Sequence, residues 1–305
     1  MNANARPLID IDWENFDPWR IQSVTHELSD HPLLQPDQLV ALGKRLQGST
    51  RVFTFNSDAS AGTNFDAVSR LYPNRKPVAE TLQRISDAKA WMLLRHVQAD
   101  ETYRELIDLA FDPIQPYIER KDPGVYYRAG WIFVASPHTI TPFHIDRNHG
   151  ILLQVRGHKK VYVWDAADTD VVSDRARDCF HARHELDLVQ WNEAFRARAK
   201  VFDLGPGMGV YMPLTSPHMV ETDDEPSITI SLTYSTRATR KNAMQHVVND
   251  LLHRIGLQTP PVGKRRLFDR LTYTAASALV AAHGTGSRPP ACPSLARRSA
   301  YAIAD

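Results

Sequence analysis

The sequence predicts a mainly β fold, either a sandwich or a jelly-roll barrel, with α-helical additions at both ends. Between residues 125 and 234, short β-type runs alternate with glycine and proline. Many short strands separated by such turn residues are typical of these two architectures. Both flanks instead carry apolar residues at helical spacing. The chain has 305 residues, which is enough for a sizeable core and for helical additions.

The first 124 residues are predicted to form a mixed, largely helical flank. Pro36 followed by Asp37 is a typical helix start, and Pro113 is expected to end the last helix of this region. Residues 121–124 read Lys-Asp-Pro-Gly, which marks a clear break. The expected elements are helices at 36–46, 78–87 and 101–111 and strands at 51–55 and 91–97.

Residues 125–236 are predicted to form the β core. The expected strands lie at 125–127, 131–136, 143–146, 151–155, 159–164, 209–212, 218–221 and 228–234. The long interruption at 166–200 is charged and partly helical. An insertion of this length in a compact barrel is expected to be structured, and such insertions often cap a site.

The chain is predicted to be helical again over residues 237–283. Two helices, at 239–255 and 264–282, each carry an apolar stripe that includes Leu251 and Leu271 respectively. These stripes could dock on the barrel or pair with the same helices of a second subunit. We predict a homodimer, because the stripes exceed what a solvated helix needs. Residues 284–305 are rich in Pro, Ser, Arg and Ala and are predicted to form a loose tail.

Composition argues against several classes of protein. The net charge of +1, from 36 basic and 35 acidic residues, lacks the basic excess of nucleic-acid-binding domains. No apolar run reaches the roughly 18 residues of a membrane span, and Asp10 and Asp12 near the start argue against a secretory signal. Cys179 and Cys292 are too few for a disulfide framework, so we expect unpaired thiols in a cytoplasmic protein.

Three residues of the β core form a candidate metal site. His144 and Asp146 are two positions apart, so on an extended backbone their side chains face the same side. His218 follows a proline-rich turn at the start of another expected strand. Two histidines and one carboxylate are the ligands of non-haem iron(II) sites with open coordination positions. His149 is expected to point away from them. The alternative is a surface histidine, a structural aspartate and an unrelated third histidine.

A second feature concerns the cation that such iron sites need when they use 2-oxoglutarate, whose far carboxylate is buried. Residues 219–236 contain no Lys or Arg, so the final strand does not supply it. Lys159 shares a strand face with Val161 and Val163, and an ammonium on an apolar face requires an anion. In the alternative register, the face of Tyr162 points inward and Lys159 is solvated.

Residues 131–164 and 209–234 resemble the JmjC / cupin-like family of Fe(II)- and 2-oxoglutarate-dependent oxygenases, in particular the asparaginyl hydroxylase that inhibits the hypoxia-inducible factor. The family motif T-P-x-H-x-D corresponds to residues 141–146, and Q-x-x-G-x-K to residues 154–159, with no gap between the two matches. The distal histidine of the family, which follows a Tyr-Met-Pro type of turn, matches His218 after residues 211–213.

The resemblance implies a double-stranded β-helix (a cupin-like jelly roll) that binds Fe(II), 2-oxoglutarate and O₂. It implies metal ligation by His144, Asp146 and His218. The activity implied is hydroxylation of a peptide side chain or a small molecule.

By the same resemblance, Thr141 and Lys159 bind 2-oxoglutarate. A polar residue late on the final strand falls at Ser231 or Thr233, and Ser231 is our assignment. The chain departs from the pattern at Gly150, where the family usually has Asn six residues after the first ligand. This departure concerns the substrate or cosubstrate and leaves the metal ligands unaffected.

Two other functions remain open from the sequence. One is a metal-binding cupin without 2-oxoglutarate chemistry, such as an isomerase or a sensor, which would have no need of an inward Lys159. The other is a JmjC-type lysine demethylase, against which the near-neutral charge and the absence of a recognisable reader module argue.

Overall fold

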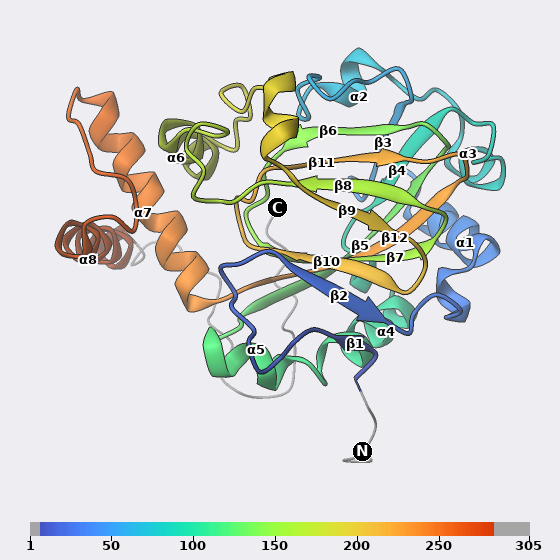
Figure 1. Cartoon of the computed structure of the whole chain (residues 1–305), viewed down its shortest axis with the longest axis horizontal. Coiled ribbons are helices and arrows are strands. Elements are labelled where there is room, and N and C mark those ends of the chain that lie inside the picture. The colour runs from blue at the N-terminus through green and yellow to red at the C-terminus, as the bar shows by residue number, and fades with distance from the viewer. Residues whose placement is uncertain (1–6, 284–305) are drawn as a thin grey trace.

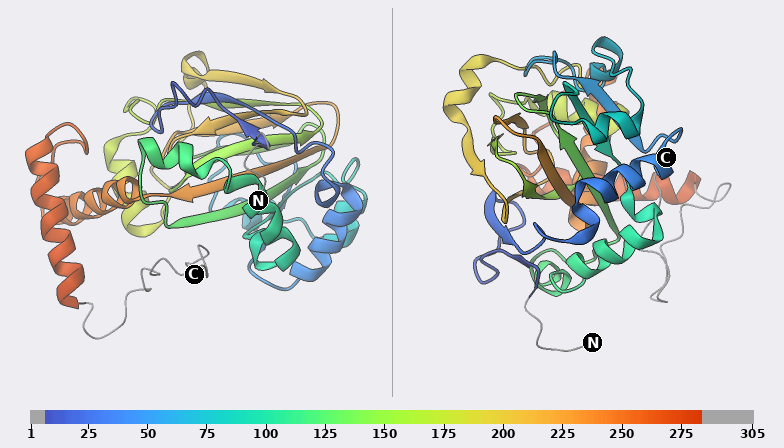
Figure 2. Two further views of the ribbon diagram at one scale, coloured as in Figure 1. Left: turned by 90° about the horizontal axis from the view of Figure 1, so that it is seen from below. Right: turned by 90° about the vertical axis from the view of Figure 1, so that its right-hand side faces the viewer.

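The computed structural model describes residues 7–283 and consists of two facing antiparallel sheets with helices around them (Figure 1 and Figure 2). The large sheet has the strand order β1 (Ile9–Asp10), β2 (Gln22–His26), β10 (Met208–Met212), β7 (His149–Arg156), β12 (Ser227–Ser235), β5 (Tyr127–Ala135), β4 (Ala90–Leu94) and β3 (Val52–Asn56). The small sheet has the order β6 (Ile140–His144), β11 (His218–Thr222), β8 (Lys159–Val163) and β9 (Lys200–Leu204). This confirms the predicted mainly β core.

Strand β12 shows how the large sheet separates the two sides of the molecule. It pairs with β5 along one edge and with β7 along the other, and all of its residues are buried. Because side chains alternate along a strand, Ile228, Ile230 and Leu232 face outward into the main hydrophobic core. Thr229 and Ser231 face inward, toward the small sheet. The polar inner face is therefore available to a site inside the barrel.

Helices α1 (Pro36–Leu46), α3 (Val78–Gln83), α4 (Glu101–Phe111) and α5 (Gln115–Lys121) supply the cover of this outer face (Figure 1). The short α2 (Val68–Leu71) lies on the far side of the molecule, near β3 and β6. Helices α1 and α4 have the predicted bounds, whereas α3 ends at Gln83, four residues early. Helix α5 was not predicted, because its Pro116 resembles a breaker but lies in the first turn, where proline is tolerated.

The strands expected at 125–127 and 131–136 form one continuous strand, β5. Gly130, the last of the three residues between them, resembles a break in the sequence but has a packing role. A Cβ atom at this position would lie 2.2 Å from Cδ1 of Ile107 on α4, so any larger residue would force this buried side chain to move.

The tight turn between β7 and β8 depends on Gly157. Its φ is +73°, and a Cβ atom there would lie 2.3 Å from the carbonyl oxygen of Pro226. We expect Gly157→Ala to lower the free energy of unfolding by at least about 1–2 kcal/mol, from the cost of a left-handed backbone alone. Urea denaturation measures this. The control is Gly48→Ala, which also has positive φ (+81°) but open space around it, so an equal loss at both sites would contradict a role for the Pro226 contact.

The insertion between β8 and β9 is structured, as predicted. It contains α6 (Asp174–Arg183) and a 3₁₀ helix at Glu193–Arg198. It packs on the outer face of the small sheet, where the ring centroids of Trp191 and Phe143 are 5.4 Å apart. It also contacts the loop after β3: Asn64 Nδ2 donates to Asp187 Oδ1 (3.0 Å), and the Leu186 amide donates to Asp66 Oδ2 (3.2 Å). These two segments together cover one end of the barrel.

The C-terminal helices α7 (Arg237–Arg254) and α8 (Arg266–His283) project away from the barrel (Figure 1 and Figure 2). Helix α7 contacts α6 through polar side chains: His246 Nδ1 lies 2.7 Å from Asp178 Oδ1, and Arg183 Nη1 donates to Asp250 Oδ1 (2.9 Å). The predicted apolar stripe is not the face that docks here, since Leu251 is 50% exposed. Docking within the chain uses the polar face of α7.

The α6–α7 contact is expected to weaken at low pH because of His181. Its ring stacks on His246 at 4.9 Å, and its Nε2 is buried without a hydrogen-bond partner among residues 7–283. Burial lowers the pKa of His181 well below its usual 6.5. The nearby basic side chains lower it further; they are His246, Arg147, His184 and Arg177. The unfolded chain therefore binds this proton first, and stability is lost as the pH falls below about 6.5.

Hydrogen exchange of the α6 amides at pH 7.5 and pH 5.5 measures this effect. After correction for the slower intrinsic exchange at lower pH, we expect smaller protection factors at pH 5.5 than at pH 7.5 in the wild type, and a smaller pH difference in His181→Gln, which does not titrate. An undiminished pH difference in the variant would assign the effect to another group.

Two sequence predictions concern thiols and membranes. Cys179 is a buried free thiol, whereas Cys292 and the predicted tail at 284–305 lie outside the described residues. Among residues 7–283, no helix is both long enough and apolar enough to span a bilayer.

Candidate metal centre

Three side chains converge where β6 ends and β11 begins. His144 and His218 are cross-strand partners in the small sheet, with ring centroids 4.1 Å apart, and Asp146 follows two residues after β6. One ligand atom from each lies within 4.8 Å of the other two. His144 and His218 are buried, while the Asp146 side chain is 50% exposed, so the cluster is open to solvent on the side of the carboxylate.

The two histidines are oriented for ligation by their own backbone. His144 Nδ1 lies 2.7 Å from the Pro142 carbonyl oxygen, and His218 Nδ1 lies 3.0 Å from that of Ser216. A carbonyl only accepts, so each Nδ1 carries the proton and each Nε2 presents a lone pair. His218 Nε2 is 3.7 Å from Asp146 Oδ2. Burial lowers the pKa of His144 to about 4, which keeps its ring neutral near pH 7. This donor set fits a divalent metal.

The register of β6 differs from the expected one. The sequence predicted a strand through residue 146 with His144 and Asp146 on one face, but β6 ends at His144. The pairing shifts between His218 and Val220, so Thr141 opposes Val220 while His144 opposes His218. This irregularity brings Thr141 and His144, three residues apart, to the same interior. Asp146 reaches the cluster from the loop.

Lys159 lies inside the barrel, so the alternative register with a solvated Lys159 is wrong. Its side chain is buried (5% exposed) beside the fully buried Val161 and Val163. Its neighbour Lys160 points outward and pairs with Asp203 (3.1 Å).

The ammonium of Lys159 has a polar support but no counter-ion. Its Nζ donates to Thr229 Oγ1, and Thr229 Oγ1 donates to Gln154 Oε1 (2.8 Å). Gln154 Nε2 is held in turn by the Gly157 carbonyl oxygen (2.9 Å). No carboxylate of residues 7–283 forms an ion pair with Lys159, and burial lowers its pKa to about 7. An anion is the missing partner of this amine.

The other predicted binding residues lie on the inner surface. Thr141 Oγ1 accepts a hydrogen bond from Trp91 Nε1 (2.9 Å), which leaves its own hydroxyl proton for another acceptor. Ser231 is buried on β12 and is the cross-strand neighbour of Leu152 and Trp131.

The unusual Gly150 leaves room beside Ser231. A Cβ atom at Gly150 would lie 3.9 Å from Ser231 Oγ, an ordinary contact distance. Asn148 does not replace the Asn side chain that the family has at position 150. It lies just before β7, and its Oδ1 accepts a hydrogen bond from Ser235 Oγ (2.5 Å). His149, predicted to point away, is buried on the other side of the sheet, where Nδ1 accepts from the Leu214 amide (3.1 Å).

Sequence reasoning missed two side chains at the centre. The Phe65 ring stacks on the His144 ring, with ring centroids 4.3 Å apart and an angle of 9° between the ring planes. Phe65 comes from the loop after β3, which carries no motif. Thr229, the partner of Lys159, lay on a predicted strand. Its place opposite Gln154 in the barrel depends on strand pairing across 75 residues, which local patterns do not specify.

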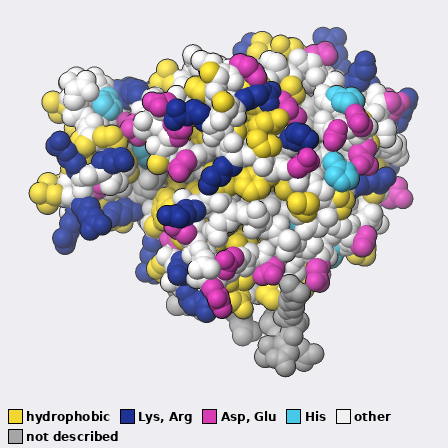
Figure 3. Space-filling model, in the orientation of Figure 1, with side chains coloured by type: hydrophobic (Ala, Val, Ile, Leu, Met, Phe, Trp, Pro, Cys, Tyr) yellow, Lys and Arg dark blue, Asp and Glu magenta, His cyan; other side chains and the backbone are white. Residues whose placement is uncertain are grey.

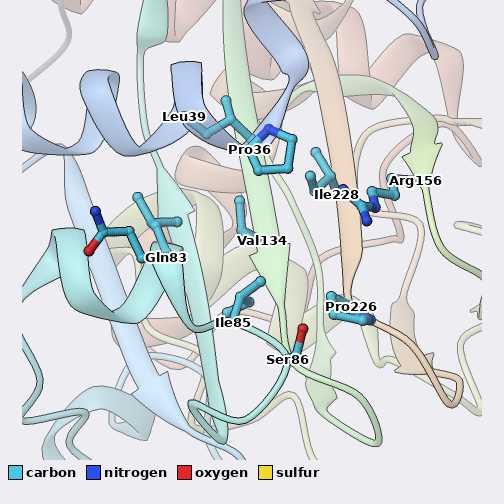
Figure 4. A pocket seen from close by; sticks show the side chains of 10 residues that line it. Pro36, Leu39, Gln83, Ile85, Ser86, Val134, Arg156, Pro226 and Ile228 are labelled. Atoms are coloured by element: carbon cyan, nitrogen blue, oxygen red, sulfur yellow. The ribbon is translucent and has the colours of Figure 1, made fainter.

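A cavity of about 200 Å³ elsewhere in the molecule is separate from this centre (Figure 4). It is lined by residues of α1, the segment after α3 and the outer face of the large sheet, including Leu39, Ile85 and Ile228. Ile228 and Thr229 are adjacent on β12 and point to opposite faces. The cavity therefore lies behind the sheet that carries Thr229.

The chain is similar to known proteins in both sequence and structure. Over 153 residues (47% of the chain), the sequence is 28% identical to the Jumonji C domain-containing protein 5 of Drosophila melanogaster. This match spans only 37% of that protein. Escherichia coli YcfD aligns with a TM-score of 0.49 and 14% identity over 88% of this chain and 66% of that one. A structure of YcfD from Escherichia coli, described as a ribosomal oxygenase in complex with cobalt and 2-oxoglutarate, aligns with a TM-score of 0.47 and 12% identity. The alignment covers 90% of this chain and 68% of that one.

The family assignment rests on a broader match. The model of the cupin-like domain matches residues 11–240, which is most of the chain. This range contains both sheets except the short β1, together with the candidate ligands and Lys159. The chain therefore belongs to the family of proteins with a cupin-like domain, as its motifs predicted.

Proposed function

We propose that this protein is an Fe(II)- and 2-oxoglutarate-dependent dioxygenase, and that it hydroxylates a peptide side chain or a small molecule. The observation that carries the proposal is the buried ammonium of Lys159, which has no counter-ion among residues 7–283 and lies in the same barrel as the histidine–carboxylate cluster. A buried charge without a partner is costly, and the far carboxylate of 2-oxoglutarate would supply one.

In this proposal the metal is held by His144, Asp146 and His218. Bound iron(II), with 2-oxoglutarate and O₂, supplies the oxidising power for insertion of oxygen into a substrate C–H bond. The remaining steps belong to side chains of the chain itself. Lys159 donates to the far carboxylate, and Thr141 offers its hydroxyl proton to the same group.

The rest of the barrel would orient the cosubstrate and exclude water. Ser231, which is buried on the inner face of β12, would donate to the cosubstrate in this proposal. Leu152, Val161 and Val163 belong to a dry cluster between the two sheets, and such surroundings strengthen the ion pair that Lys159 would make.

The buried amine of Lys159 also helps to distinguish the proposed function from the two alternatives. A cupin without 2-oxoglutarate chemistry gives no reason for an inward lysine without an acidic partner. A JmjC-type demethylase would share the centre and differ only in the substrate, so it remains an outcome of substrate assays.

The test is anaerobic addition of Fe(II) and then 2-oxoglutarate to the protein. We expect a visible charge-transfer band that requires both additions, because 2-oxoglutarate chelates the metal. If the metal binds but the band does not form at millimolar 2-oxoglutarate, the protein is a metal-binding cupin of another kind.

We also propose a homodimer through the C-terminal helices. Leu251, Ile255, Leu267 and Leu271 are all at least half exposed on α7, α8 and their connection. Hydrophobic side chains lie among Lys and Arg over this lobe in the space-filling view (Figure 3). Solitary exposed leucines are ordinary, but a group of them on one projecting lobe is typical of an interface.

Light scattering tests the dimer. We expect wild type at micromolar concentration to have about twice the chain mass of 34.5 kDa, and Leu251→Glu/Leu271→Glu to have the mass of one chain. The matched control is Leu109→Glu, an equally exposed leucine on α4, which should leave the mass unchanged. A wild-type mass of one chain would show that the lobe does not mediate self-association under these conditions.

A further inference from the structure

Arg95 lies on the inner side of the large sheet, beside the candidate centre. Leu94 on β4 pairs with Ile132 on β5, so the next residue, Arg95, is level with Trp131, which pairs in turn with Ser231 on β12. The Arg95 guanidinium carbon is 5.9 Å from the Trp131 ring centroid. Arg95 therefore stands in the same row of the sheet as Ser231.

Aromatic rings connect this guanidinium to the metal-ligand cluster. The Arg95 guanidinium carbon lies 4.5 Å from the Phe53 ring centroid, Phe53 is 5.8 Å from Phe65, and Phe65 stacks on His144 at 4.3 Å. The carboxylates of Asp146 and Asp66 are near enough to favour the charged form of Arg95, although burial lowers its pKa overall. A positive charge thus lies near the candidate site, close enough to interact with the carboxylate of Asp146.

This guanidinium lacks an acceptor. No residue of the described chain forms a hydrogen bond or ion pair with it, and its Nε is buried without a partner. The contacts of the guanidinium with Phe53 and Trp131 are cation–π contacts with the rings, and they leave the Nε–H group without an acceptor. In the same row, Trp131 Nε1 is a second buried donor without an acceptor among residues 7–283. Two such donors together point to a ligand that brings the acceptors.

The nearby acidic side chains do not fill this role. Asp146 is committed to the candidate metal site, and Asp66 Oδ2 accepts from the Leu186 amide of the insertion. The cosubstrate is also accounted for, because Lys159 lies on β8 of the opposite sheet and already offers a buried cation.

We propose that Arg95 determines substrate specificity by binding a carboxylate of the substrate, with Trp131 Nε1 as a second donor. The inference rests on the proposed dioxygenase function, since it assigns the substrate class of that site. An arginine fork matches a carboxylate with two parallel hydrogen bonds, and the partly buried position strengthens them. The carboxylate belongs to an acidic amino-acid side chain or to a small free acid.

The test compares acid and amide probes of the same shape. The protein is loaded with Mn(II), which does not turn over, and saturated with 2-oxoglutarate so that Lys159 is occupied. N-acetyl-glutamate N-methylamide and its glutamine analogue are then titrated, followed by butyrate and butyramide, with the relaxation of probe protons by Mn(II) as the readout. This signal reports both affinity and proximity to the metal.

We expect wild type to bind an acid probe at least tenfold more tightly than its amide. Arg95→Gln should remove the preference, Arg95→Lys should keep part of it, and Trp131→Phe should weaken the acid probe about twofold to threefold. Lys160→Gln, which removes a charge from the outside of the barrel, is the control and should change nothing. Preference for the glutamate derivative alone indicates a peptide substrate, and preference for butyrate as well indicates a small acid.

Equal affinities of wild type for acid and amide, or an unchanged preference in Arg95→Gln, would overturn the inference. Loss of 2-oxoglutarate binding in Arg95→Gln would also overturn it, because Arg95 would then belong to the cosubstrate site. Failure of the wild type to bind 2-oxoglutarate at all is a different result, which contradicts the proposed function and is visible before any probe is added.

Discussion

Replacing Lys159 with alanine should weaken the binding of 2-oxoglutarate by about tenfold to a hundredfold and leave Fe(II) binding nearly unchanged. The amine is buried and has Thr229 as its hydrogen-bond partner, so the variant loses the charge that would receive the far carboxylate. A charge-assisted hydrogen bond of this kind contributes about 1.5–3 kcal/mol. At ~1.4 kcal/mol per decade, this corresponds to the stated loss of affinity.

The matched control is Lys160→Ala. Lys160 is the next residue on β8, points to the outside of the barrel and pairs with Asp203, so its loss should affect neither ligand. All three proteins are titrated with 2-oxoglutarate while the charge-transfer band is followed. Equal affinities for wild type and Lys159→Ala, or a larger loss for Lys160→Ala, would contradict the assignment of Lys159 to the cosubstrate.

The same amine predicts how the affinity for 2-oxoglutarate depends on pH. Burial lowers the pKa of free Lys159 to about 7, and a bound carboxylate would raise it again because it stabilises the ammonium. Binding therefore takes up a proton above pH 7, and the affinity should fall as the pH rises from about 7 toward 9. This slope should be absent in Lys159→Ala, which identifies the group.

The inner face of the barrel was predictable where side chains alternate along a regular strand. Lys159, Val161 and Val163 were assigned to one face from their spacing, and all three are buried. The assignment worked because β8 pairs without irregularity with both β11 and β9. A period of two then determines every side-chain direction once one residue is placed.

The same rule failed where pairing is irregular. His144 and Asp146 were expected to share a strand face, but β6 ends at His144 and the register shifts opposite Val220. Such a shift depends on the partner strand, which is more than 70 residues away in the sequence. Residue type and motif selected three side chains that do lie together, while the geometry that brings them together was not predicted.

Contacts between distant polar residues could not be predicted at all. The sequence left open whether the apolar stripe of α7 docks on the barrel or pairs with a second subunit, and gave no sign that α7 docks on α6 through His246 and Asp250, whose partners are Asp178 and Arg183. A single polar residue on a helix gives no sign of its partner. No sequence pattern identifies Phe65, which stacks on His144, because it lies in a loop without a motif.

Replacing any one of the candidate ligands with alanine should abolish stoichiometric binding of Fe(II). His144, Asp146 and His218 offer three donor atoms within 4.8 Å of one another, and no fourth His, Cys, Asp or Glu among residues 7–283 joins this group. A divalent ion held by three protein donors loses a third of its protein ligands in each variant. Loss of occupancy is therefore expected to be nearly complete at micromolar metal.

The fold should survive best in Asp146→Ala, because that side chain is half exposed and lies in a loop. The His144 ring packs on Phe65, so His144→Ala also removes a buried contact, and circular dichroism should be compared with that of wild type. His158→Ala is the control, since His158 is exposed and pairs with Glu225 at the surface. Iron is measured after anaerobic dialysis against Fe(II). We expect one iron per chain in wild type and in His158→Ala, and almost none in the three ligand variants. Full occupancy in Asp146→Ala and His144→Ala would show that the metal binds elsewhere.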